Sequence, residues 1–191
     1  MSLINSKNSE VNLLFKAIQD GDFIALQRLV KSNINLEQED NRGYTPLLLA
    51  VNLGHLKIAK TLLNAGASPC WLNEMTIVNA IYEQRQDILL FLINLGIDVN
   101  QKLVENENRT VLMEAAKIGD LKIVKTLVEH GSDVNAVSKK NHFALMNAAC
   151  QGWQEIYNYL APLTSSRLRN LAEKALPNGS IARKRKDDIQ W

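Results

Sequence analysis

The chain has 191 residues, of which 46% are hydrophobic and 22% are charged, and its formal net charge is +2 at pH 7. This composition is typical of a folded, soluble domain, so disorder is not the default expectation. The excess of positive charge lies after residue 163, and the rest of the chain is close to neutral, which argues against a body built to bind nucleic acid.

The cysteine content and the hydropathy pattern indicate where the protein resides. Two cysteines, Cys70 and Cys150, exclude a disulfide scaffold and suit a reducing compartment. The first residues lack the basic start and continuous apolar segment of an export signal, and no apolar run approaches the roughly 20 residues that span a bilayer. We therefore expect a cytoplasmic protein that does not enter a membrane.

Residues 41–67 contain the clearest copy of a repeated unit. Thr45 is placed to cap a helix that begins at Pro46, because the fixed backbone angle of proline suits the first helical position. Gly54 interrupts the pattern, apolar residues then recur at helical spacing, and Gly66 is placed to end a second helix in the left-handed conformation. The stretch predicts two short helices joined by a turn.

The same unit recurs along the chain in one register, at intervals of 30 to 35 residues. An alanine anchors each first helix, a glycine follows it by four residues in most units, and a second glycine closes several second helices. The anchors are Ala17, Ala50, Ala80, Ala115 and Ala148, the turn glycines are Gly21, Gly54, Gly119 and Gly152, and the closing glycines are Gly66, Gly96 and Gly131. Because short helix pairs cannot bury their apolar faces alone, the units must be stabilised by stacking.

These residues resemble the ankyrin-repeat family, whose units carry a TPLH-like helix start, a turn glycine, a leucine-rich second helix and a GADVN-like loop. The second unit reads TPLLLA, and the fourth reads GSDVN from Gly131. The resemblance covers about residues 10–163 and implies an all-α solenoid of about five helix-turn-helix units. Their expected boundaries are 10–41, 42–72, 73–106, 107–139 and 140–163.

The third unit departs from the family pattern at three positions. It has Met75 and Thr76 where the Thr-Pro pair is expected, and Gln84 where the turn glycine is expected. We therefore expect it to be the weakest unit and the one most adapted to a specific task.

Both ends of the repeat array carry additional segments. We expect residues 1–9 to be an extension and residues 164–177 to form a C-terminal helix that caps the stack, with a membrane-seeking helix as the alternative. Trp153, Tyr157 and Tyr159 are expected to pack against this capping helix. Residues 178–191, with the basic run RKRK, are interpreted as a flexible, solvated tail or, alternatively, as a tag for nuclear import or an anionic surface.

The sequence contains no arrangement typical of catalysis. The three histidines fall in different units without paired spacing, no pair of carboxylates shares a helical face, and no glycine-rich loop follows a strand. We predict no enzymatic activity, no metal, no cofactor and no small-molecule substrate.

In the family that the chain resembles, partners bind in the groove formed by first helices and loop tips. The resemblance maps this groove to Arg42, Tyr44, Asn52, Leu53, Trp71, Leu72, Glu74, Tyr82, Glu83, Arg109, Lys117, Lys139, Lys140 and His142. Aromatic residues dominate binding energy when they are buried at an interface, and the lysines favour an acidic patch on the partner. Alternatively, Trp71 and Tyr82 only fill the irregular third unit.

The predicted function is that of a monomeric, non-catalytic module that binds a protein partner of unknown identity. An inhibitor, an immunity protein and an effector or scaffold all agree with the pattern, and an effector would be delivered into a host cell by a signal not visible here. The alternative is an adapter directed to nucleic acid or to the nucleus by its basic tail.

Overall fold

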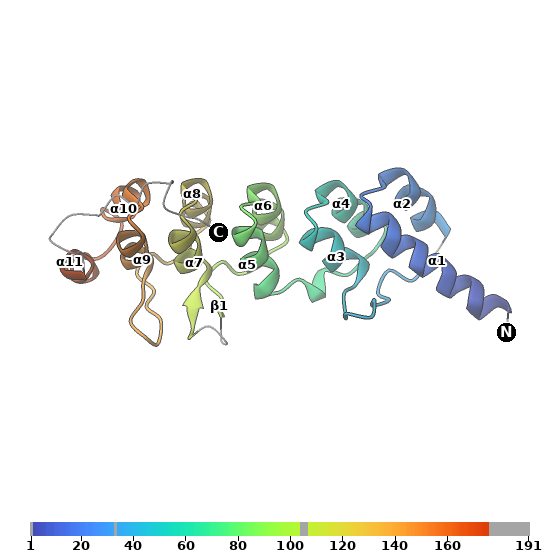
Figure 1. Cartoon of the computed structure of the whole chain (residues 1–191), viewed down its shortest axis with the longest axis horizontal. Coiled ribbons are helices and arrows are strands. Elements are labelled where there is room, and N and C mark those ends of the chain that lie inside the picture. Colours follow the sequence, from blue (N-terminus) through green and yellow to red (C-terminus); the bar gives the residue numbers. More distant parts are fainter. Residues whose placement is uncertain (1, 33, 104–106, 176–191) are drawn as a thin grey trace, which may run out of the picture. The chain divides into compact units, whose positions relative to one another are not determined.

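The computed structural model describes residues 2–32, 34–103 and 107–175, and these residues form an all-α repeat solenoid, as the resemblance implies (Figure 1). The helix pairs are α1 (Ser2–Gln19) and α2 (Phe23–Leu29), α3 (Pro46–Asn52) and α4 (Leu56–Asn64), α5 (Glu74–Tyr82) and α6 (Gln86–Asn94), α7 (Val111–Ile118) and α8 (Leu121–Glu129), and α9 (Ala144–Gln151) and α10 (Gln154–Leu160). A further helix, α11 (Ser166–Ala175), follows α10, and short 3-10 helices lie at Val30–Ser32 and Pro69–Trp71. Residues 2–9, expected as an extension, belong to α1, and residues 178–191, expected as a tail, lie outside the described residues.

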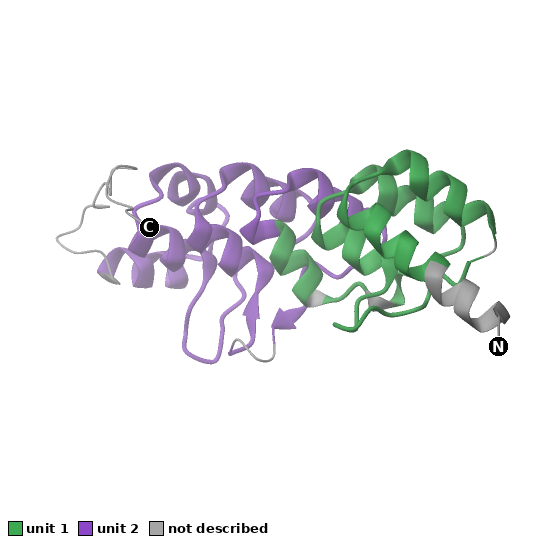
Figure 2. Ribbon diagram, turned by 45° about the vertical axis from the view of Figure 1, so that its right-hand side comes forward, with its two compact units in different colours: residues 1–80 green, residues 81–191 purple. Residues whose placement is uncertain are grey.

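The chain divides into two compact units, residues 1–80 (unit 1) and residues 81–191 (unit 2), shown in Figure 2. In unit 1, α1 packs on α3 and α2 packs on α4. Leu14, Ile18, Leu26, Ala50 and Leu62 are fully buried there. The apolar stripes found in the sequence therefore form the core between successive helix pairs.

In unit 2, the helices form two layers: α7, α9 and α11 in one, and α6, α8 and α10 in the other (Figure 1). The anchor residues Ala115 and Ala148 are fully buried where α7 packs on α9, and their small side chains let the two backbones approach closely. Leu168 and Ala172 of α11 are buried as well, and α11 packs on α9.

The helix α3 begins as the sequence predicts, and α5 begins with a substitute cap. Thr45 precedes α3, and its side-chain oxygen accepts a hydrogen bond from the backbone N–H of Leu48 at 3.3 Å, while Pro46 is the first helical residue. In the third repeat, which lacks this pair, the side-chain oxygen of Asn73 accepts from the N–H of Met75 at 3.0 Å. The start of α5 is thus capped by a different residue type with the same chemistry.

The turn between the two helices of each repeat is left-handed throughout the array. The residues with positive φ at this position are Gly21, Gly54, Gln84, Gly119 and Gly152. Gln84 adopts φ of +53° although it has a side chain, so the third repeat keeps the turn geometry without the glycine. The left-handed region costs a residue with a Cβ roughly 1–2 kcal/mol.

The loops of unit 2 are joined by asparagine side chains. Asn100 donates from Nδ2 to the carbonyl of Gly131 at 2.9 Å, and its Oδ1 accepts from the N–H of Asp133 at 2.7 Å. Asn135, in the equivalent position of the next repeat, accepts from the N–H of Ser165 at 2.7 Å, just before α11. The two GSDVN-like loops of unit 2 therefore each bond to the segment that follows the next helix pair.

A short β-hairpin precedes α7. Strand β1 (Lys102–Leu103) pairs with β2 (Arg109–Thr110) in antiparallel register, with Leu103 opposite Arg109. The hairpin sets the direction in which the Arg109 side chain leaves the backbone.

The expected packing of three aromatic residues against α11 is wrong for two of them. The indole N–H of Trp153 donates to the carbonyl of Lys117 at 3.0 Å, so this residue contacts the preceding repeat. The Tyr159 ring lies 5.6 Å from Lys125 Nζ of α8, again in the preceding repeat. Both side chains therefore contact the preceding repeat.

Candidate protein-binding surface

The predicted groove residues fall in both units. Unit 1 holds Arg42, Tyr44, Asn52, Leu53, Trp71, Leu72 and Glu74, and unit 2 holds Tyr82, Glu83, Arg109, Lys117, Lys139, Lys140 and His142. The side chains of Trp71 and Glu74 lie outside the described part of the structure. The contacts among the remaining residues are therefore those within each unit.

In unit 1, Arg42 and Tyr44 hold a turn around Asp40. The Arg42 guanidinium lies 3.0 Å from Asp40 Oδ2 and 5.1 Å from the centre of the Tyr44 ring. Burial by itself raises the pKa of Asp40, but hydrogen bonds from the backbone N–H groups of Tyr44 and Arg42, together with the Arg42 charge, outweigh it and lower this pKa. The two predicted residues thus stabilise their own loop.

The other described groove residues of unit 1 are divided between surface and interior. Leu53 is exposed, and Asn52 is half-buried and accepts a hydrogen bond from Asn79 at 3.4 Å. Leu72 is buried, so it belongs to the interior and not to the surface where we expected it.

A cavity of about 440 Å³ lies between α1 and the loop before α3, and the sequence analysis missed it. Val11, Phe15 and Gln19 of α1 line one side, and Glu39 and Asp40 line the other. Gln19 follows its anchor alanine by two residues, as Asn52, Tyr82 and Lys117 do, and this spacing is the signal that could have identified it.

In unit 2, two predicted residues meet at Glu114, and a third contacts one of them. The Tyr82 hydroxyl donates to Glu114 Oε2 at 3.0 Å, and Arg109 Nε lies 2.5 Å from Glu114 Oε1. Arg109 Nη1 lies 3.4 Å from His142 Nδ1. The structure therefore joins Tyr82 and Arg109 through a carboxylate that sequence reasoning did not select, and Arg109 in turn contacts His142.

The position of Glu114 follows from the repeat. Tyr82 lies two residues after one anchor alanine, and Glu114 lies one residue before the next. Asn52 and Asn79 occupy the same two positions in an earlier pair of repeats and are also hydrogen-bonded. A signal for Glu114 was present, because it is the one charged residue between Val111 and Ala116 in an otherwise apolar helix start.

Arg109 is an internal residue and not the surface contact that we expected. Its side chain and that of Glu114 are buried, with residue exposures of 8% and 1%. The buried Nη2 of Arg109 has no hydrogen-bond partner among the described residues, so Glu114 provides the main compensation for the guanidinium charge. Breaking such a pair leaves an uncompensated buried charge.

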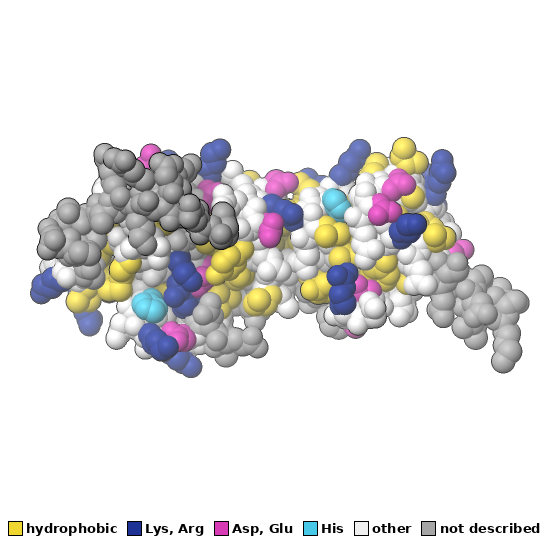
Figure 3. All heavy atoms as spheres, in the orientation of Figure 1, with side chains coloured by type: hydrophobic (Ala, Val, Ile, Leu, Met, Phe, Trp, Pro, Cys, Tyr) yellow, Lys and Arg dark blue, Asp and Glu magenta, His cyan; other side chains and the backbone are white. Residues whose placement is uncertain are grey.

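The exposed residues around this cluster are mainly basic. Lys117 and Lys139 are exposed, Lys140 forms an ion pair with Glu107, and His142 is half-buried. Figure 3 shows Lys and Arg side chains beside a histidine over the loop between α8 and α9. Glu83 is exposed and lies 3.8 Å from Arg85, so it adds one negative charge near Tyr82. We call Tyr82, Lys117, Lys139, Lys140 and His142 the basic surface.

Tyr82 is the aromatic member of the basic surface. Half of the residue is exposed, with a fraction of 50%, while its hydroxyl is held by Glu114. Burial and then the nearby Glu114 carboxylate raise the pKa of Tyr82 above its ordinary value, so the hydroxyl stays a donor at neutral pH. The ring edge is therefore fixed in place and accessible.

The family model for ankyrin repeats in three copies matches residues 2–73 and 77–170. The chain belongs to the ankyrin-repeat family. Ankyrin repeats are generally non-enzymatic modules for protein–protein interaction.

This ankyrin-repeat chain is similar to curated proteins from several organisms. It is 30% identical over 151 residues to ankyrin repeat protein FPV014 of Fowlpox virus. That match covers 77% of the chain and 34% of the viral protein. It is 30% identical over 128 residues to 26S proteasome regulatory subunit p28 of Saccharomyces cerevisiae, with 63% of the chain and 55% of the relative covered. It is 24% identical over 123 residues to the ankyrin repeat, SAM and basic leucine zipper domain-containing protein 1 of Dasypus novemcinctus. That match covers 62% of the chain and 26% of the relative. The chain thus spans between about a quarter and about half of each relative.

Two further observations concern the described part of this ankyrin-repeat chain. No three His, Cys, Asp or Glu side chains among the described residues are grouped to hold a metal ion. No described helix has both the length and the apolar character to cross a bilayer. The basic run at 183–186 lies outside the described residues.

Proposed function

We propose that this ankyrin-repeat chain is a non-catalytic module that binds a protein partner through the basic surface of unit 2. The observation that carries the proposal is the fixation of a half-exposed aromatic ring: Tyr82 is held by Glu114, which is held in turn by Arg109. A side chain that is ordered before binding loses less conformational entropy when the complex forms. Tyrosine is also among the residue types that supply most of the binding energy at interfaces.

The charge of the surface favours an acidic segment on the partner. Lys117 and Lys139 are exposed, and neither forms an ion pair with a described residue. Exposed lysines steer an oppositely charged partner and increase the association rate, and this effect decreases as salt screens it.

The proposed action is masking or scaffolding of the bound protein, as an inhibitor, an immunity protein or an effector. One relative is named as a regulatory subunit of the 26S proteasome, which supports association with other proteins. We place this action in a reducing cytosol, and the free, exposed thiols of Cys70 and Cys150 support that placement.

Affinity capture from the source lysate, followed by titration of the captured protein, tests the basic surface. We expect Tyr82→Ala to weaken binding by about 30-fold, the equivalent of about 2 kcal/mol. Lys117→Glu/Lys139→Glu should weaken binding at low salt by at least about tenfold, with a smaller difference at high salt.

The matched control is Lys122→Glu/Lys174→Glu, which makes the same charge change at exposed positions of α8 and α11 in the same unit. It should bind as the native chain does. Thermal unfolding of each variant shows whether the fold is retained. Undiminished affinity of both the Tyr82 variant and the Lys117/Lys139 variant would contradict the assignment.

A further inference from the structure

The outer face of the α1–α2 pair in unit 1 is apolar and has no covering helix among the described residues. Ile24 of α2 is 64% exposed and Leu13 of α1 is 52% exposed. Ile24 is the most exposed large hydrophobic side chain that the structure describes.

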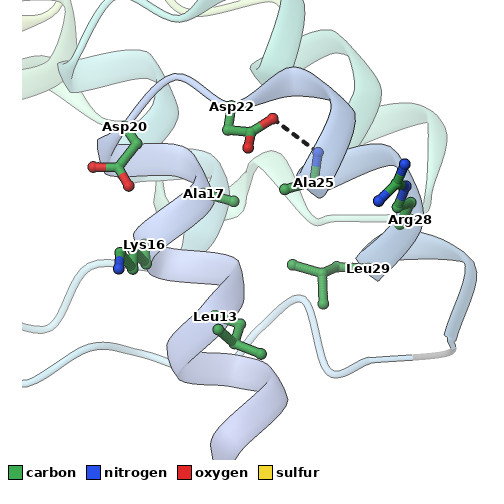
Figure 4. A pocket seen from close by; sticks show the side chains of 8 residues that line it. All are labelled: Leu13, Lys16, Ala17, Asp20, Asp22, Ala25, Arg28 and Leu29. Atoms are coloured by element: carbon green, nitrogen blue, oxygen red, sulfur yellow. Dashed lines mark hydrogen bonds between the residues drawn. The ribbon is translucent and has the colours of Figure 1, made fainter.

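This face is hollowed between the two helices. A cavity of about 400 Å³ has Leu13 and Ala17 of α1 on one side and Ala25 and Leu29 of α2 on the other, as Figure 4 shows. The two alanines leave room for a side chain from outside to enter between the helices. Apolar concave faces of this kind are sites of protein association.

Two basic and two acidic residues surround the hollow. Lys16 and Asp20 lie on the α1 side, Arg28 lies on α2, and Asp22 lies at the start of α2 (Figure 4). Asp22 accepts a hydrogen bond from the N–H of Ala25 at 2.9 Å. Lys16, Asp20 and Arg28 form no ion pair with any described residue. The rim thus offers two positive and two negative groups around one apolar floor.

We propose that a second copy of this chain covers the face, with the α1–α2 pairs of the two copies meeting across a two-fold axis. A two-fold contact uses the same patch on both copies, so the patch must be complementary to itself. This one is, because apolar floor meets apolar floor and the basic groups of each rim can pair with the acidic groups of the other. The contact makes the chain a dimer, which departs from the monomer that we expected.

The described part of α11 is more polar on its outer side than the α1–α2 pair. The helix α11 buries Leu168 and Ala172 against its own unit. Its exposed residues are Leu171, at 43%, and the polar residues Arg167, Asn170, Glu173 and Lys174. A contact between the α1–α2 face and α11 would place Leu13 mainly against polar groups, so the two-fold contact is favoured.

The size of the α1–α2 face determines the affinity that we expect for the dimer. The helix α2 has only seven residues, and α1 with 18 residues is about 27 Å long. We expect a contact limited to these two helices to be smaller than the roughly 800 Å² per partner of a standard interface. The dimer should therefore dissociate on dilution through the micromolar range.

Sedimentation velocity of the full chain, at concentrations from about 1 to about 500 μM, tests the proposal. We expect the native mass to rise from one copy to two across this range. Leu13→Glu and Ile24→Glu should remain monomeric throughout. The control Val137→Glu, at a position 41% exposed in unit 2, should dimerise as the native chain does.

A charge-complementation experiment tests the rim separately from the floor. Lys16→Glu/Arg28→Glu leaves only acidic groups on the rim, and Asp20→Lys gives it an excess of basic groups while preserving the Asp22 cap. Each variant alone should self-associate at least about tenfold more weakly, and the mixture of the two should form a heterodimer. Circular dichroism melting confirms that the variants fold. A native chain that stays monomeric at every concentration, or a dimer that neither set of substitutions weakens, would overturn the proposal and assign the face to another protein.

Discussion

Trp153 lies across Gly119, and its indole N–H donates to the carbonyl of Lys117 at 3.0 Å. Gly119 ends α7 with φ of +100°, and Trp153 precedes α10 in the next repeat. A Cβ at position 119 would overlap the indole ring. Glycine is therefore required here both by the backbone angle and by the ring of the next repeat.

We expect Gly119→Ala to lower the free energy of unfolding by about 2–4 kcal/mol, because left-handed strain and overlap with the indole both contribute. Gly131→Ala is the matched control, since Gly131 has φ of +88° but no described atom lies within 4 Å of the place that a Cβ would take. It should lose only the backbone contribution of about 1–2 kcal/mol. Urea unfolding measures both, and equal losses would show that the Trp153 contact is unimportant.

Gln84 has a left-handed backbone at the turn between α5 and α6, where the other four helix pairs have a glycine. We expect Gln84→Gly to raise the free energy of unfolding by about 0.5–1 kcal/mol, because relief of strain exceeds the added freedom of the unfolded chain. Asn141 also has a positive φ, of +60°, and asparagine adopts this region readily. Asn141→Gly should therefore change stability little, and a loss of stability on Gln84→Gly would contradict the prediction.

The buried ion pair between Arg109 and Glu114 should contribute more to stability than the hydrogen bond that the Tyr82 hydroxyl donates to Glu114. Glu114→Gln leaves the Arg109 guanidinium buried without its carboxylate, and we expect a loss of about 3–5 kcal/mol in the free energy of unfolding. Tyr82→Phe removes one hydrogen bond at a half-exposed site that water can reach, so the loss should be about 1 kcal/mol. Chemical denaturation of both variants checks the order, and the reverse order would contradict our account of the cluster.

Stability should decrease at alkaline pH. Burial, and then a nearby glutamate, raise the pKa of Tyr82, Tyr157 and Tyr159 above 10.0. The folded state therefore holds these protons more tightly than the unfolded state, and the resulting stabilisation is complete below pH 10 and is lost as the pH rises through the folded pKa values. Urea midpoints measured above pH 10 should fall with pH, and more gently for Tyr82→Phe than for the native chain. Identical slopes would show that Tyr82 does not contribute.

The sequence predicted the repeat and its helix signals well, because these depend on short-range rules. Thr45 and Pro46 start a helix as expected, and the equivalent alanines Ala50 and Ala115 are both fully buried. The sequence did not predict that Arg109 turns inward. Its position at a loop tip suggested exposure, but the β-hairpin directs it toward Glu114, which belongs to α7.

Local patterning by itself determined that this chain is a stack of short helix pairs, since caps, turns and apolar stripes act over a few residues. Only the tertiary structure decided which polar side chains lie inside the stack and which remain on its surface. Tyr82 and Glu114 are 32 residues apart, and Trp153 and Lys117 are 36 apart. Such pairs form because stacking brings equivalent positions of successive repeats together, and whether two side chains there meet depends on their lengths and directions in the folded protein.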